Sequence, residues 1–261
     1  MKLRNIVLAI AALAMVGSAS AAVFPDFNVD PDMASPSSFF TADKITGNYV
    51  EVITFGPSNT FTVSLQWSAG QFVKNDGTTA IAPLTSRLGV DYGLYALFTG
   101  SGTTSTSGPA TTFTLNPGGA VSFFYDKNVD TTFTAPGSGS APWTTGLNLD
   151  DLLLATGAAI SGSGTLDPTL PTCGGSGINC GSFGQTTGFN LTANGSKFFI
   201  DPVPFYNVSF QSGQLNNFTP TGTQSINGSL DLVFSPIPEP TTLALVGLAL
   251  VGLGISRRRS T

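Results

Sequence analysis

Residues 61 to 67, Phe-Thr-Val-Ser-Leu-Gln-Trp, alternate without a break between apolar and polar side chains. Successive side chains of a β-strand point to opposite faces, so this period of two predicts an antiparallel strand with one buried and one solvated face. The pattern returns in residues 90–98 and 230–234. The apolar faces there are Val90, Tyr92, Leu94, Ala96 and Phe98 in the first segment, and Leu230, Leu232 and Phe234 in the second.

Shorter apolar segments predict further strands at 49–55, 120–126, 197–200 and 206–210. Turn-forming sequences such as GPSN, KNDGTT, NPGG and APGSGSAP separate the strands. Residues 149–154 could begin as a helical turn, but the glycine- and serine-rich continuation is a poor helix and favours a strand. Many short strands divided by turns indicate an all-β fold, an antiparallel β-sandwich or jelly-roll-like domain over residues 22–235.

The charge of this segment argues against a nucleic-acid partner. Between residues 22 and 236, five Lys or Arg stand against fourteen Asp or Glu, a net charge of −9. Phosphate backbones require a basic surface, which such a chain does not offer. The 261 residues also contain no histidine, which excludes Ser-His and Cys-His catalysis and His-ligated zinc sites. We therefore expect a protein that is not an enzyme and that needs no cofactor.

The amino-terminal segment predicts export. Lys2 and Arg4 precede an apolar run at 6–16, and small residues follow at 19–21. A basic start, a short apolar run and an Ala-x-Ala site are typical of a secretory signal peptide, here residues 1–21. The alternative is a membrane anchor, for which the apolar run is short.

Cys173 and Cys180 are the two cysteines of the chain. In the oxidising compartment that export implies, we expect them to form a disulfide, because the three glycines between them allow the chain to reverse tightly. A redox-active or metal-binding pair is the alternative, but no further ligands accompany this spacing.

A partial match to a calcium loop lies after the segment 120–126. Asp126, Asn128 and Asp130 alternate like the first ligands of such a loop, although Thr131 and Gly137 stand where the loop requires Gly and Glu. A surface loop is therefore the main interpretation, and calcium binding is the alternative.

Adjacent carboxylates form a second candidate site. Paired carboxylates serve glycoside hydrolysis when a cleft holds them about 5 to 10 Å apart. Asp150 and Asp151 are neighbours in the sequence, and neighbours on a strand point to opposite faces, so we do not expect them to converge. A polysaccharide-acting enzyme would need these side chains, or Asp126 and Asp201, to meet in one cleft.

The two tryptophans differ in their expected roles. Trp67 belongs to the apolar face of the strand at 61–67, so we expect it in the core. Trp143 lies in the loop sequence APWTTG and is the candidate sugar contact, since aromatic rings stack on sugars when they are exposed.

The carboxyl-terminal segment predicts a membrane helix. Residues 241–256 carry no charge, and Arg257, Arg258 and Arg259 follow them. As a helix they would extend about 24 Å, slightly less than a ~30 Å hydrocarbon core. Arginines at its end would hold that end in the cytoplasm. We expect a single transmembrane helix that serves as a transient inner-membrane anchor; the alternative, a buried core helix, is disfavoured beside three arginines.

Pro238-Glu239-Pro240, the apolar run and the arginines together resemble the PEP-CTERM sorting signal of Gram-negative bacteria that make exopolysaccharide. The resemblance covers residues 236–261. It implies recognition by an exosortase, a membrane-embedded cysteine protease or transpeptidase, with processing near the Pro-Glu-Pro. Pro238, Glu239 and Pro240 would then be a recognised motif, and the mature protein would reach the cell surface or the extracellular matrix.

Segments 40–55, 61–72, 90–100 and 121–128 are in addition similar to the flocculation-associated PEP-CTERM proteins. That resemblance implies a role in floc formation, in which exported protein helps to retain extracellular polysaccharide around aggregated cells. We therefore expect an exosortase-sorted surface or matrix protein that promotes aggregation or biofilm cohesion. A plain carbohydrate-binding module and a polysaccharide-acting enzyme are the alternatives.

Overall fold

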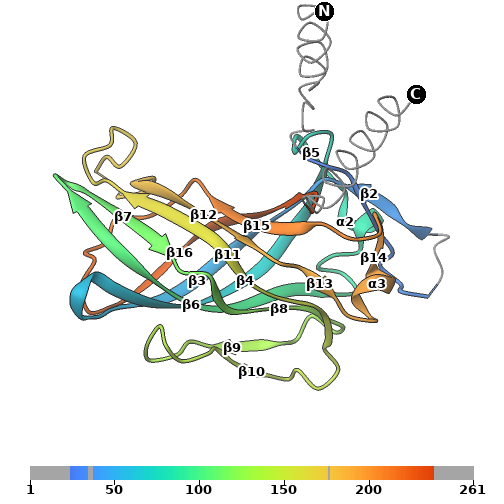
Figure 1. The fold of residues 1–261 in the computed structure, drawn as a ribbon. Coiled ribbons are helices and arrows are strands. Elements are labelled where there is room, and N and C mark those ends of the chain that lie inside the picture. Colours follow the sequence, from blue (N-terminus) through green and yellow to red (C-terminus); the bar gives the residue numbers. More distant parts are fainter. Residues whose placement is uncertain (1–23, 35–37, 176, 238–261) are drawn as a thin grey trace, which may run out of the picture.

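The computed structural model describes residues 24–34, 38–175 and 177–237 (Figure 1). The predicted signal peptide, 1–21, and transmembrane helix, 241–256, lie outside these residues. Within the described part of the chain, no helix is long and apolar enough to cross a membrane. The short helices are η2 (Pro57–Asn59), α2 (Pro83–Ser86) and α3 (Gly195–Phe198).

Strands make up most of the described structure. They are β1 (Phe27–Val29), β2 (Phe40–Ala42), β3 (Lys44–Phe55), β4 (Thr60–Lys74), β5 (Thr79–Ala80), β6 (Gly93–Ser107), β7 (Ala110–Leu115), β8 (Gly118–Asp126), β9 (Thr132–Thr134), β10 (Thr144–Gly146), β11 (Leu152–Leu166), β12 (Gly181–Thr187), β13 (Asn190–Leu191), β14 (Phe199–Asp201), β15 (Asn207–Ser212) and β16 (Thr223–Ser235).

Eleven of these strands form one antiparallel sheet, in the order β5-β4-β3-β16-β15-β12-β11-β7-β6-β8, with β13 beside β11. β4 also pairs with β6, from Thr60 opposite Thr103 to Ser68 opposite Tyr95. The path of paired strands therefore returns to its start, and the sheet folds over into two layers around a common core. The predicted all-β antiparallel sandwich is confirmed.

Most of the strands predicted from alternation are present. In β16 the side chains of Leu230, Leu232 and Phe234 are buried, as expected. In the segment 90–98, Tyr92, Leu94, Ala96 and Phe98 are buried. Val90 lies before β6 begins and is 56% exposed, so its expected place on that apolar face is wrong.

The prediction of a half-buried strand at 61–67 is only partly right, because β4 is buried on both faces from Val63 to Trp67. Phe61, Val63, Leu65 and Trp67 pack inward, yet the polar Ser64 and Gln66 are buried as well. A hairpin made of β9 and β10 lies against the outer face of this layer and covers it (Figure 1). The cover comes from residues distant in sequence, so local alternation could not reveal it.

Two other local predictions have different outcomes. The segment 197–200 is not a continuous strand, because α3 ends at Phe198 and β14 begins at Phe199. In contrast, the strand favoured over a helix at 149–154 is present as β11, which starts at Leu152 after a turn.

One end of the molecule, called here the near end, holds the small sheet β14-β1-β2 together with α2 and α3 (Figure 1). Its core is a dense group of aromatic rings. The Phe27 ring lies 4.6 Å from that of Phe234, and the Phe199 ring lies 4.8 Å from that of Phe205. The first and last strands of the described chain therefore meet here, in a well-packed core.

Trp67 occupies the core between the two ends, as its sequence position predicts. Its indole Nε1 donates a hydrogen bond to the carbonyl oxygen of Leu230, 2.8 Å away. To reach it, the ring crosses β3 at Gly47, where a Cβ atom would come within 2.5 Å of Nε1. Since any larger residue would collide with the ring, glycine at position 47 makes the buried tryptophan possible.

Candidate functional site

The outer faces of β11, β12 and β15 form an open groove of about 770 Å³. These strands lie side by side in the order β15-β12-β11 (Figure 1). Because side chains alternate along each strand, every second residue points into the groove. The outward polar side chains are Ser161, Ser163, Thr165, Ser182, Thr186, Ser209 and Gln211.

The chemistry of the groove is that of hydroxyl and amide groups. Thr186 Oγ1 and Ser209 Oγ lie 3.0 Å apart and share a hydrogen bond across the strands. Ser163 and Thr165 are exposed, so their hydroxyls face water. Among the described residues that line the groove, none is charged. Such a surface can donate hydrogen bonds to, and accept them from, an uncharged polymer rich in hydroxyl groups.

A glycine of β11 allows close packing beneath the groove. Gly164 faces inward, where a Cβ atom would lie 2.8 Å from Cβ of Phe183. The absence of that atom lets the Phe183 side chain pack under β11. Sequence reasoning missed the groove, although SGSGT at 161–165 alternates glycine with a hydroxyl residue. Only the pairing of β11 with β12 brings the two segments together.

Trp143, the candidate sugar contact, lies just before β10 and is half-buried. Its Nε1 donates to the backbone carbonyl oxygen of Ser64 at 3.2 Å. The indole therefore fixes the β9–β10 hairpin to the outside of β4. Only the part of the ring that remains exposed is available to a sugar.

The loop with the partial calcium match is held by hydrogen bonds within the protein. The carboxylate of Asp126 accepts bonds from the backbone N–H groups of Asp130, at 3.2 Å, and Thr131, at 3.1 Å. Asn128 donates instead to the Asp150 carboxylate. Within the described ranges, no group of three or more acidic or cysteine side chains is arranged to hold a metal ion.

The structure brings Asp126, Asp150 and Asp151 into one neighbourhood, whereas Asp201 lies on β14 of the small sheet. The hydroxyl groups of Tyr95 and Thr131 donate to Asp151 Oδ2 at 2.6 and 2.9 Å.

These surroundings shift the pKa of the Asp151 carboxyl. Burial raises the pKa of its carboxyl above the ordinary value, and the two neighbouring carboxylates raise it further, while the hydroxyl donors lower it. Thr131 lies just before β9, and Asp151 lies just before β11. The hydrogen bond between their side chains therefore connects these two segments.

The predicted disulfide is present between Cys173 and Cys180. It closes a loop at the end opposite the aromatic core, which we call the far end. Backbone bonds join this loop to the connection between β15 and β16, through Cys180 N–H to the Leu215 oxygen at 2.8 Å and Asn217 N–H to the Gly177 oxygen at 2.7 Å. The disulfide therefore stabilises two far-end loops together.

Comparison with known proteins identifies the carboxyl-terminal segment. Residues 236–259 match the family described as the PEP-CTERM protein-sorting motif. The match contains Pro238, Glu239, Pro240 and the arginines 257–259, all of which lie outside the described residues. The motif marks the chain as an exported exosortase substrate that is transiently anchored in the membrane before processing. Comparisons with curated proteins and with solved structures gave no match.

Proposed function

We propose that this protein is a non-enzymatic surface or matrix protein that retains extracellular polysaccharide and so promotes cell aggregation. The observation that carries the proposal is the uncharged groove of hydroxyl and amide side chains on β11, β12 and β15. The groove belongs to an exported, acidic domain, which offers few cationic side chains to a negatively charged polymer. An uncharged polysaccharide offers the matching set of hydroxyl donors and acceptors.

A binding experiment tests the groove. The double change Ser163→Ala with Thr165→Val removes two outward hydroxyls at exposed positions, so the fold should persist. We expect binding to the producing organism's own exopolysaccharide to weaken by roughly tenfold, in line with the loss of two hydrogen bonds. The matched control is Ser105→Ala with Thr106→Val, on the exposed part of β6 outside the groove. Equal binding by both double variants would remove the groove from the proposal.

Deleting the gene tests the cellular role. Cells without the protein should disperse while polysaccharide synthesis continues at its normal level. Flocs of undiminished size in the deletion strain would contradict the proposed role.

The alternative of a carbohydrate-binding module centred on Trp143 predicts a different result. In that case Trp143→Ala should weaken polysaccharide binding more than the change at Ser163 and Thr165. The half-buried indole, with its Nε1 bonded to Ser64, favours the groove instead.

The enzyme alternative has one observation in its favour, the proximity of Asp126, Asp150 and Asp151. However, neighbouring donors in the protein already bind all three carboxylates. We expect no release of reducing ends when the protein is incubated with the polysaccharide. Release that Asp151→Asn abolishes would replace our proposal with a hydrolase.

A further inference from the structure

Four exposed apolar residues form a patch beside the end of β16, at the near end. Val203 and Pro204, in the connection between β14 and β15, are exposed, and Val203 is 86% exposed. Pro236 and Ile237, which directly follow β16, are exposed as well. We call these four residues the exit patch, because the chain leaves the fold there. Their exposure means that the described part of the chain does not cover the patch.

The pairing of β15 with β16 brings the two parts of the exit patch together. The register places Asn207 opposite Ser235, which is the first residue of one strand against the last residue of the other. In an antiparallel pair, the residues that precede the first strand therefore lie beside those that follow the second. The buried rings agree with this arrangement, because the Phe205 ring lies 5.4 Å from that of Phe234. Both parts of the patch thus lie at the same end of this strand pair.

The predicted membrane segment begins a few residues after the exit patch. Only the Pro-Glu-Pro motif separates Ile237 from the uncharged run 241–256. A fully extended chain covers at most about 14 Å over the four steps from 237 to 241. As a helix, the uncharged run would be shorter than the ~30 Å hydrocarbon core, so it has no residues to spare for a longer tether.

This short tether holds the patch at the lipid headgroups while the chain is anchored. The headgroup layer on each side of a bilayer is about 5 to 8 Å thick. Ile237 therefore lies no more than about 14 Å from the hydrocarbon core, which is within about 9 Å of the outer limit of the headgroups. Because β16 pairs with β15 up to Ser235, the folded domain cannot move further away without breaking this pairing.

The charge of the surrounding segment indicates which kind of contact with lipid is possible. Residues 199–237 contain Asp201 and Asp231 but no lysine or arginine. Attraction to anionic headgroups requires basic side chains, which this segment does not offer. Apolar side chains bind instead at the boundary between headgroups and acyl chains, where removing them from water is favourable.

We propose that the exit patch docks on the lipid bilayer while the sorting signal anchors the chain, with the side chains of Val203 and Ile237 among the headgroups. The inference rests on the PEP-CTERM match, which indicates transient anchoring, and not on the proposed binding of polysaccharide. The contact would last until processing releases the chain from the membrane.

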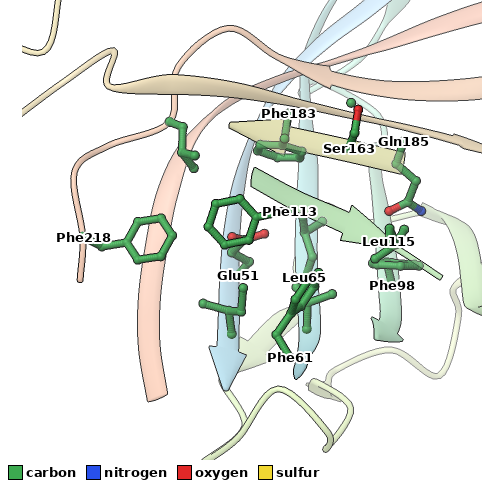
Figure 2. A pocket seen from close by; sticks show the side chains of 15 residues that line it. Glu51, Phe61, Leu65, Phe98, Phe113, Leu115, Ser163, Phe183, Gln185 and Phe218 are labelled. Carbon is green, nitrogen blue, oxygen red and sulfur yellow. The ribbon is translucent and has the colours of Figure 1, made fainter. Parts of the chain in front are cut away.

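Paramagnetic relaxation tests this docking on the full chain, anchored in nanodiscs of phosphatidylcholine that include a small share of gadolinium-chelating lipid. Gadolinium at the headgroups broadens the methyl signals of side chains close to the bilayer. We expect roughly threefold more broadening at Val203 and Ile237 than at Leu84, which is exposed at the same end but follows β5, three strands or about 14 Å from β16. Leu65 and Leu115, which line the pocket at the far end (Figure 2), should not broaden.

A flexible linker separates contact with lipid from mere proximity. The tether alone holds Ile237 close to the bilayer, whatever the patch does. A second protein therefore carries about 20 Gly and Ser residues between Ile237 and Pro238, which lets the domain move roughly 25 Å away. We expect Val203 to remain more strongly broadened than Leu84 in this protein, because the patch itself binds lipid.

Two matched variants of the linker protein show whether the patch directs the contact. Val203→Ser should reduce the excess broadening of Ile237 over Leu84 roughly twofold, because it removes apolar surface from the patch. Leu84→Ser, the equivalent change outside the patch, should leave the broadening of Val203 unchanged. Both positions are more than four-fifths exposed, so both variants should fold.

Three results would overturn the proposal. The first is equal broadening of Val203 and Leu84 in the linker protein, which would mean that only the tether holds the patch near lipid. The second is excess broadening of Ile237 that Val203→Ser leaves unchanged. The third is a Val203 signal that shifts with protein concentration and does not broaden, which would assign the patch to a second copy of the chain. None of these results bears on the polysaccharide groove, which other residues form.

Discussion

The near and far ends of the sandwich share strands but differ in how their cores are filled. At the near end, Phe199 packs against six other phenylalanines with ring-centroid distances of 4.8 to 6.1 Å. At the far end, the same two layers line a partly open cavity of about 80 Å³, with the buried carboxyl of Glu51 and the unpartnered amide of Gln185 among its lining groups. Close packing stabilises a core, whereas the atoms that line a cavity lose contacts on one side. The difference indicates that the near end contributes more to the stability of the fold than the far end.

The largest expected effect comes from removing an aromatic ring at each end. Phe199→Ala should lower the free energy of unfolding by about 3 to 5 kcal/mol, because the ring is fully enclosed. Phe113→Ala should cost at least ~1 kcal/mol less, since one side of that ring already borders the cavity and makes fewer contacts. Urea unfolding of both variants measures the two values. Equal losses would show that the two ends are packed alike.

Ionisation of Glu51, at the far end, should have a smaller effect on the free energy of unfolding. Its pKa rises through burial from 4.5 to about 7, so between these pH values the folded state keeps a proton that the unfolded state releases. The free energy of unfolding should therefore fall as the pH rises from about 4.5 through about 7, by about 3 kcal/mol in total.

Comparison of Glu51→Gln with the original protein isolates this contribution. The variant keeps the shape of the side chain but cannot ionise, so it should lose the decline and be the more stable protein at pH 8. Urea unfolding at pH 5 and at pH 8 gives the four values required. Asp231→Asn is the control, because its partly exposed pair with Lys44 contributes little. If the free energy of unfolding of Glu51→Gln falls by the same amount between pH 5 and pH 8, a group other than Glu51 causes the decline.

The smallest of the three effects concerns the disulfide. Changing both Cys173 and Cys180 to serine should lower the free energy of unfolding by about 2 kcal/mol, as loop entropy predicts for so short a loop. Amide hydrogen exchange should become faster around Leu215 and Asn217, which bond to the disulfide loop, and stay unchanged at β1 and β14. Faster exchange at both ends would mean that the ends do not behave as separate regions.

Local patterns in the sequence were sufficient for the strands but not for their arrangement. The alternation at 61–67 and 230–234 predicts β4 and β16, because a half-buried strand needs only a period of two. The hairpin over Ser64 and Gln66, and the pairing of β4 with β6, depend on contacts between distant segments. No pattern within a short sequence segment predicts either of these two contacts.

The candidate functional residues also divide into those that local sequence can predict and those that it cannot. Cys173 and Cys180 were predictable as a disulfide because the compartment and the spacing suffice. Glu51 could also have been found, since alternation places it on the face of Tyr49 and Ile53, where a carboxyl is unexpected. The groove requires that β11, β12 and β15 be neighbours, which only the folded topology shows.

The position of β16 sets the order in which the exported chain can fold. This strand lies between β3 and β15, so the ring of strands stays open until β16 has been inserted. It ends at Ser235, three residues before Pro238 of the sorting motif. A chain that emerges amino end first must therefore wait for nearly its whole length before this long-range pairing can form. Completion of the fold thus requires a strand that stands directly before the sorting motif in the sequence.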